Sequence, residues 1–97
     1  MKISILLPLK ENFSPEYPGA VSIFINDTLN YSKFKTSTTV FGSTEFKKKF
    51  NHNYINLKTK NFLFQSQNKK YVQEFEKYEK INISDIIEIH NRPNYVN

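Results

Sequence analysis

The sequence predicts an α/β domain built around a parallel β-sheet. Two observations lead to this fold class: four short runs typical of strands, and two amphipathic stretches between them with the spacing of helices. Strands that alternate with helical segments favour βαβ crossover units, which place neighbouring strands parallel. The 97 residues suit one domain, and an aromatic content of 15% argues against a disordered chain.

The first half of the chain predicts a strand, a loop, a helix and a second strand. Residues 2–7 form an apolar run that suits a strand buried on both faces, and the run ends at Pro8. A polar loop follows, with three of the four prolines and one of the two glycines. Residues 20–31 then predict a helix from the spacing of Val21, Phe24, Ile25, Thr28 and Leu29. Residues 35–41, rich in Thr, Val and Phe, predict the second strand.

The second half predicts a short helix, two further strands and a longer helix. Residues 43–50 are typical of a short capped helical turn, and residues 54–57 alternate as in a strand. A loop is expected over residues 59–68. A helix over about residues 69–80 follows from the spacing of Tyr71, Val72, Phe75 and Tyr78. The fourth strand is expected at residues 85–89.

Composition excludes several classes of protein. No apolar run approaches the ~20 residues of a membrane span, and the N-terminus lacks the apolar region and cleavage site of a signal peptide. There is no Cys, which excludes disulfides and thiolate metal sites. The two His residues are distant from each other, and His52 is expected in a loop, which argues against zinc. We therefore expect a cytoplasmic protein, able to lie at the inner face of a membrane, without metal or cofactor.

The formal net charge of +5 permits two interpretations. A basic chain suits an anionic partner such as nucleic acid or phospholipid. Thirteen Lys and twelve Asn beside few Gly and Ala also fit an AT-rich coding background, which raises Lys without a functional cause. No RNA-recognition aromatic motif is present, which argues against nucleic acid. A small basic α/β module that binds nucleic acid or anionic lipid stays the alternative function.

Two segments at expected strand ends carry candidate chemistry. Pro18 and Gly19 precede the first helix, whose N-terminal N–H groups suit a phosphate, although neither glycine-rich nucleotide motif is present. His90, Asn91 and Arg92 follow the fourth strand, and this Arg is the only one in the chain. An imidazole there can hydrogen-bond a hydroxyl or accept a proton, and a guanidinium can hold an anion in a fork. An ordinary strand–helix turn and a His that caps a helix beginning at Pro93 are the structural alternatives.

These segments together resemble the N-terminal portion of a family 4 (group 1) GT-B glycosyltransferase. The first strand begins at residue 2 with Lys-Ile-Ser-Ile-Leu-Leu-Pro, and residues 18–21, Pro-Gly-Ala-Val, take the place of the family's glycine-rich loop. The strongest likeness is in residues 85–93, Asp-Ile-Ile-Glu-Ile-His-Asn-Arg-Pro. They look like the family's Asp-apolar-apolar-x-x-His strand, of which His-Asn-Arg-Pro is a recurrent ending.

The resemblance implies a partial Rossmann-like, three-layer fold with strand order 3-2-1-4 and helices on both faces. Residues 1–97 would be the incomplete, acceptor-side domain of a retaining hexosyltransferase that uses a nucleotide-sugar donor in cell-envelope polysaccharide biosynthesis. His90 would lie near the transferred sugar as a catalytic residue. Gly19 and the adjoining Pro18 would approach the donor diphosphate, and Asn91 and Arg92 would bind substrate on the acceptor side.

Two departures from the family shape what we expect of this chain. The family commonly has two adjacent glycines where this chain has Pro18 before Gly19. The second domain, which holds most of the nucleotide-sugar, has no counterpart in the 97 residues. We therefore expect a fragment that is inactive alone, whose full-length enzyme takes a sugar or lipid-linked acceptor, and which self-associates through the exposed edge of its fourth strand.

Overall fold

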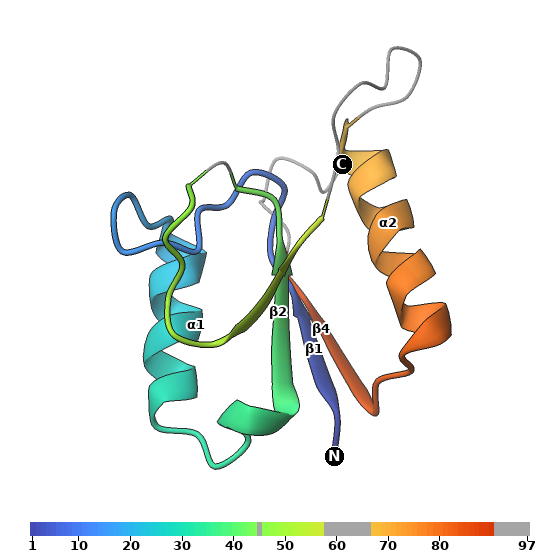
Figure 1. Ribbon diagram of the computed structural model, residues 1–97, viewed down its shortest axis with the longest axis horizontal. Helices are drawn as coiled ribbons and strands as arrows, with labels where there is room; N and C mark the ends of the chain where they lie inside the picture. The colour runs from blue at the N-terminus through green and yellow to red at the C-terminus, as the bar shows by residue number, and fades with distance from the viewer. Residues whose placement is uncertain (45, 58–66, 91–97) are drawn as a thin grey trace.

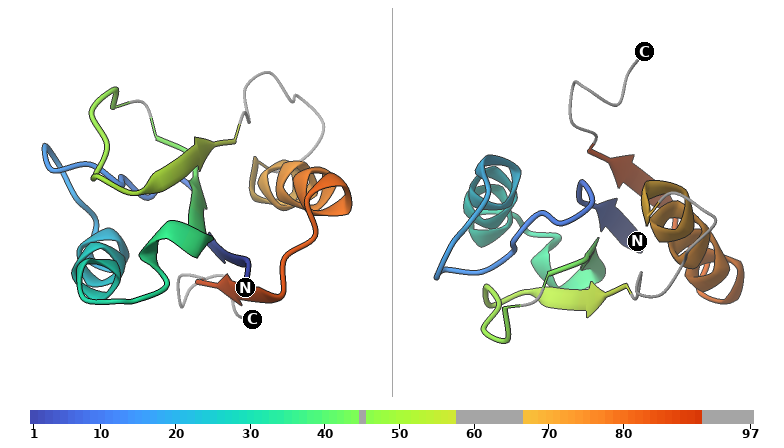
Figure 2. Two further views of the ribbon diagram at one scale, coloured as in Figure 1. Left: turned by 60° about the horizontal axis from the view of Figure 1, so that its bottom comes forward. Right: turned by 90° about the horizontal axis from the view of Figure 1, so that it is seen from above.

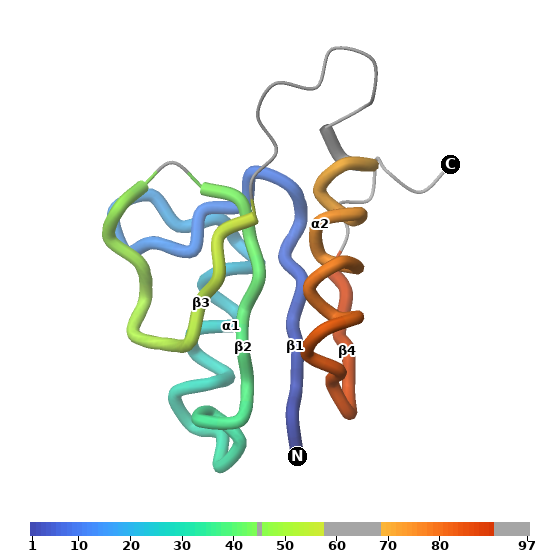
Figure 3. The backbone as a smooth tube through the Cα atoms, turned by 45° about the vertical axis from the view of Figure 1, so that its right-hand side comes forward, coloured from blue at the N-terminus to red at the C-terminus, as the bar shows by residue number. Residues whose placement is uncertain are grey.

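Four parallel strands and two helices make up the computed structural model, which describes residues 1–44, 46–57 and 67–90 (Figure 1). All three strand pairs are parallel, in the order β3-β2-β1-β4 (Figure 3), and α1 and α2 lie on opposite faces of the sheet (Figure 2). The predicted fold class, strand order and placement of the helices are confirmed, and they are those of a partial Rossmann-like fold. In chain order the elements are β1 (Ile3–Leu6), α1 (Ala20–Asn30), the 3₁₀ helix η1 (Lys35–Ser37), β2 (Thr38–Gly42), β3 (Asn53–Asn56), α2 (Gln67–Ile81) and β4 (Ile86–Ile89).

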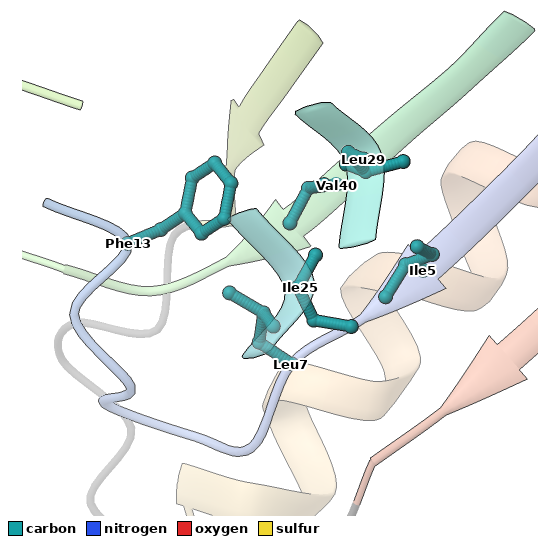
Figure 4. Packing of buried hydrophobic residues seen from close by; sticks show 6 residues of the cluster. All are labelled: Ile5, Leu7, Phe13, Ile25, Leu29 and Val40. Carbon is teal, nitrogen blue, oxygen red and sulfur yellow. The ribbon is translucent and has the colours of Figure 1, made fainter. Parts of the chain in front are cut away.

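Alternate residues of β1 and β2 fill the space beneath α1. Ile5 and Val40 pack against Ile25 and Leu29 of the helix (Figure 4). Phe13 comes from the loop after β1, is completely buried in the same cluster, and stacks on Tyr54 of β3 at 5.5 Å between ring centroids. Phe13 therefore anchors the loop in the core, because its ring packs against both α1 and the sheet.

The opposite face of the sheet is covered by α2. Its buried side chains Tyr71 and Phe75 pack against Leu6 and Phe41 of the central strands, and Phe41 meets Phe75 edge-on at 5.0 Å. The Tyr71 hydroxyl donates a hydrogen bond of 2.6 Å to the backbone carbonyl of Leu7, just past the end of β1. The helical stripe predicted from the sequence is thus confirmed. Among the described residues, no helix combines the length and the apolar character needed to cross a bilayer.

Three local expectations are wrong. Residues 35–37 form η1 instead of the start of a strand, because the Thr38 hydroxyl donates to the Phe34 carbonyl and tightens the turn. The helical turn predicted over residues 43–50 is absent from residues 46–50. There the Phe50 N–H donates a hydrogen bond of 3.2 Å to the Phe13 carbonyl, which holds this segment against the loop after β1. On α1 the buried positions are Ser22, Ile25 and Leu29, whereas the predicted Phe24 and Thr28 face solvent.

The connection from α2 into β4 is held by polar contacts to the start of β1. Glu79 accepts hydrogen bonds from the Ser84 N–H at 3.0 Å and the Ser84 hydroxyl at 2.8 Å, and the hydroxyls of Ser4 and Ser84 are in contact. Burial raises the pKa of Glu79, but the hydrogen bonds from Ser4 and Ser84 outweigh it, so that the pKa lies below its ordinary value. Asp85 accepts from the Lys2 N–H at 2.7 Å. These contacts set the register of β4 on β1.

β4 is the exposed side of the sheet within the described part of the chain. It pairs with β1 along one edge, and no described strand pairs with the other. Ile86, Ile87 and Ile89 each leave about half of the residue exposed to solvent. Ile86 lies beside Ile3 on the α1 face, while Ile87 lies beside the buried Ser4 on the α2 face. The α2 face of this strand is therefore apolar and half exposed, the α1 face carries Glu88 beside Ile86, and the backbone groups of the outer edge have no partner strand among the described residues.

The hydrogen bond from Tyr71 gives a test of the packing between α2 and β1. Replacing Tyr71 with Phe keeps the ring but leaves the buried Leu7 carbonyl without its hydroxyl partner, so we expect the free energy of unfolding to fall by about 1–3 kcal/mol. Urea denaturation measures the change. Tyr78→Phe is the matched control, because Tyr78 is only half-buried and its ring also contacts Phe41. Equal losses in both variants would show that the hydroxyl of Tyr71 has no special role.

The exposed edge of β4 predicts concentration-dependent self-association, because unpaired strand edges invite pairing with a second chain. Sedimentation velocity should show dimers or larger species as the protein concentration rises. Ile87→Lys should suppress them, since a charge on an edge strand opposes pairing, whereas Ile23→Lys on α1, a residue exposed to a similar extent, should not. A wild-type chain that stays monomeric at high concentration contradicts this prediction.

Candidate functional site

The carboxyl ends of β1 and β4 form the part of the sheet where a ligand is expected. β1 leads through α1 to β2 on one side, whereas β3 leads through α2, on the opposite face, to β4 on the other side of β1 (Figure 2). The strand order therefore reverses between β1 and β4. Such a reversal marks a topological switch point, and ligands of open α/β sheets bind outside the carboxyl ends of the strands there. The loop after β1 starts at this end of the sheet, and His90 follows the end of β4 there.

His90 lies directly past the end of β4. Its backbone N–H donates to the Leu6 carbonyl at 2.9 Å, so the ladder between β1 and β4 continues to this residue. Its imidazole Nε2 lies 2.8 Å from the Glu88 carboxylate, two residues earlier on the same face of the strand. The imidazole is partly exposed and held by one carboxylate. Asn91 and Arg92 lie outside the described residues, so their binding role stays a prediction.

Gly19 is the residue that precedes α1, as predicted, but it does not need a glycine conformation. Its φ of −75° and ψ of 163° are extended values that any residue adopts. The reason for glycine is space, because a Cβ at this position would lie 1.7 Å from Oε2 of Glu11. Gly19 is therefore small because the Glu11 side chain lies against it.

The Glu11 carboxylate occupies the N-terminus of α1, where the resemblance places a diphosphate. Glu11 is only 5% exposed, and its Oε2 accepts a hydrogen bond from the Ser22 N–H at 3.1 Å. This N–H is one of those that a helix leaves without a partner in its first turn, and the positive end of the helix dipole favours a negative charge there. The helix thus carries its own anion.

Glu11 is not among the residues that the sequence predicts to be functional, because its signal in the sequence is weak. It lies in a polar loop next to Lys10, a setting typical of solvated residues. One clue was present: a glycine that directly precedes a helix, in a chain with only two glycines, can indicate a close approach of another group. The sequence alone does not distinguish an approaching ligand from an approaching side chain.

A pocket of about 420 Å³ opens beside this carboxylate. We call it the β1–α1 pocket, and residues 10–12, residues 17–19 and Phe46 line it. Pro18 and Gly19, both predicted to bind substrate, are thus in its wall. Lys10 has a φ of 64°, a left-handed conformation that is uncommon for a residue other than glycine and is found at functional sites as well as in turns.

His52, the second histidine, has a structural role in the described part of the chain. Its Nε2 lies 2.9 Å from Oδ1 of Asn26 on α1, and its Nδ1 is buried without a partner among the described residues. Burial and the nearby Lys35 lower the pKa of His52, although a hydrogen bond with the Asn26 backbone works in the opposite direction. His52 is in the loop before β3, as predicted, and ties this loop to α1.

Neither metal ligation nor similarity to other proteins adds to this picture. Among the residues that the structure describes, no three His, Asp or Glu side chains gather in a way that could hold a metal ion. No protein-family model matches the chain, and no curated protein or solved structure matches it significantly.

The lowered pKa of His52 predicts how stability depends on pH. The folded chain binds a proton at His52 less readily than the unfolded chain, so stability is full above the unfolded pKa of about 6.5 and falls as the pH drops below it. Urea denaturation between about pH 7.5 and about pH 5.5 avoids most carboxylate titration. His52→Gln should reduce this pH dependence, whereas His90→Gln should keep the part due to His52. An unchanged pH dependence in His52→Gln would contradict the assignment.

Proposed function

We propose that the chain is the N-terminal, acceptor-side part of a GT-B glycosyltransferase that moves a sugar from a nucleotide-sugar donor to an acceptor. The observation that carries the proposal is the position of His90, at the carboxyl end of β4 and beside the end of β1. This is the switch point of a sheet with the strand order that the sequence resemblance implies. The proposal also rests on the likeness of residues 85–93 to the His-containing strand of that family.

His90 has a geometry suited to a sugar hydroxyl. Glu88 lies 2.8 Å from Nε2 and can hold the ring in one orientation, which leaves Nδ1 for a ligand at the end of the strand. A neutral imidazole held in this way accepts a hydrogen bond from a hydroxyl or takes up a proton. In the proposed enzyme, His90 binds the transferred sugar and Glu88 is its positioning residue.

The 97 residues are proposed to bind sugar without transferring it. In the proposed enzyme, the nucleotide of the donor is held mainly by a second domain, and the acceptor is a sugar or a lipid-linked sugar. A place in the cytoplasm, at the inner face of the membrane, follows from such an acceptor and is part of the same proposal. Salt-sensitive binding to DNA, RNA or anionic vesicles, without binding of sugars, would instead favour the basic binding module.

The two histidines allow a direct test of this proposal. In a chain with labelled histidine side chains, NMR resolves the imidazole signals of His90 and His52 in one sample. We expect nucleotide-sugars such as UDP-glucose or GDP-mannose, at millimolar concentration, to shift the His90 signals and leave those of His52 unchanged. His90→Gln assigns the signals and should weaken binding while the fold is kept. No response of His90 to any nucleotide-sugar would count against the sugar-transfer function.

A further inference from the structure

The Glu11 carboxylate is an unusual group for a phosphate site to contain. It is nearly completely buried, lines the β1–α1 pocket, and accepts one hydrogen bond through Oε2. Among the described residues, neither a second donor nor a cation within ion-pair distance accompanies it. Oε1 is not among the buried atoms of the described residues that lack a partner, so it is open to solvent in the pocket and can accept from a ligand that carries hydroxyl groups.

The other side of the pocket offers an aromatic surface. Tyr17 and Phe46 stack with ring centroids 5.9 Å apart and an angle of 21° between planes, and Tyr17 is 73% exposed. Two rings held nearly parallel at a pocket rim present flat apolar area to a ligand. A sugar ring has an apolar face of C–H groups and a polar edge of hydroxyls, so it matches a surface with rings on one side and polar groups on the other.

Asn12 adds a donor that is held in place. Its Oδ1 accepts from the Thr44 hydroxyl at 2.8 Å, which leaves its amide N–H₂ without a partner among the described residues. Thr44 is fixed in turn, because its backbone N–H donates to Oδ1 of Asn56, which also accepts from the Tyr54 hydroxyl, both at 2.8 Å. The pocket thus combines the carboxylate acceptor of Glu11 with the amide donor of Asn12, and Thr44 links Asn12 to Asn56 at the end of β3.

The charges of the pocket match a neutral ligand. Lys10 and Glu11 both line it, and their formal charges cancel. A phosphate would therefore meet no net attraction, and a carboxylate already accepts from the Ser22 N–H at the helix terminus. Two anions brought this close repel each other strongly where water is partly excluded. A cationic ligand likewise meets no net attraction, because the charge of Lys10 offsets that of Glu11.

We propose that the β1–α1 pocket is a subsite for a neutral sugar ring and that Glu11 makes it reject phosphorylated sugars. This inference rests on the proposed function, because it names the kind of substrate that the acceptor side takes. Glu11 accepts from sugar hydroxyls, Asn12 donates to one, and Tyr17 with Phe46 covers the apolar face of the ring. The volume of about 420 Å³ lies in the range of about 300–1,000 Å³ that is typical of small-molecule sites.

The experiment is an NMR titration of the isotope-labelled 97-residue chain, read at the Gly19 amide and at the rings of Tyr17 and Phe46. The probes are glucose, galactose, mannose, N-acetylglucosamine, glucose 1-phosphate and inorganic phosphate. We expect at least one neutral sugar to shift these signals, and glucose 1-phosphate to bind about tenfold or more weakly than glucose. Glu11→Gln keeps the shape of the side chain and should bring the affinities for glucose and glucose 1-phosphate to within about twofold.

Matched variants separate binding from folding. Tyr17→Ala should abolish sugar binding and keep a folded spectrum, because Tyr17 is largely exposed. Tyr31→Ala, at a tyrosine that is 93% exposed beyond the other end of α1, should bind as the wild type does. The proposal is overturned if no neutral sugar shifts the pocket signals, if either phosphate probe binds more tightly than every neutral sugar, or if Tyr17→Ala binds normally.

The readouts keep this inference separate from the sugar-transfer proposal. Pocket signals that respond to neutral sugars, beside a His90 that ignores nucleotide-sugars, would support the subsite and count against the role of His90 in sugar transfer. A His90 that responds to nucleotide-sugars, beside pocket signals that do not respond to any neutral sugar, would remove the subsite alone.

Discussion

The contact between the Glu11 carboxylate and the N-terminus of α1 organises the region of the molecule that matters for function. A buried carboxylate is stable only where its lost hydration is replaced, and here the Ser22 N–H at 3.1 Å and the helix dipole replace part of it. The same contact explains why residue 19 is a glycine, since any Cβ would collide with Glu11. It also draws the loop after β1 back onto the helix, so that the loop becomes one wall of the pocket.

Two different chemistries lie past the carboxyl ends of the parallel strands. On one side of the β1 end, His90 and Glu88 form an imidazole–carboxylate pair on an exposed strand. On the other side, the β1–α1 pocket offers a carboxylate, an amide and two rings. The first suits proton transfer or a hydroxyl contact, and the second suits recognition of a neutral ring. In the function that we propose, the first binds the transferred sugar and the second binds the acceptor.

The sequence predicted the architecture well, because hydrophobic periodicity reports which faces of an element are buried. Residues 2–7 and the stripe from Tyr71 to Tyr78 are clear cases, and both lie as predicted. Prediction fails where a residue distant in sequence determines the local backbone structure or the burial of a side chain. Residues 46–50 are not helical, and the Phe50 N–H is hydrogen-bonded to the carbonyl of Phe13, more than thirty residues earlier. Phe24 faces solvent, although its spacing along α1 predicts the buried face. At the site, the sequence indicates a close approach to Gly19 but assigns it to a diphosphate, whereas the approaching group is the Glu11 carboxylate. Glu11 itself is not predicted from the sequence.

A double-mutant cycle between Glu11 and Gly19 tests the central contact most directly. The measured quantity is the free energy of unfolding in urea for Glu11→Ala, Gly19→Ala and the double variant. Because the Cβ that Gly19→Ala introduces would displace the carboxylate, the single changes remove one and the same contact, worth about 1–3 kcal/mol. We therefore predict that the double variant costs less than the sum of the singles by about 1 kcal/mol or more. Costs that add to within about 0.5 kcal/mol would show that Glu11 and Gly19 are independent and would contradict this account.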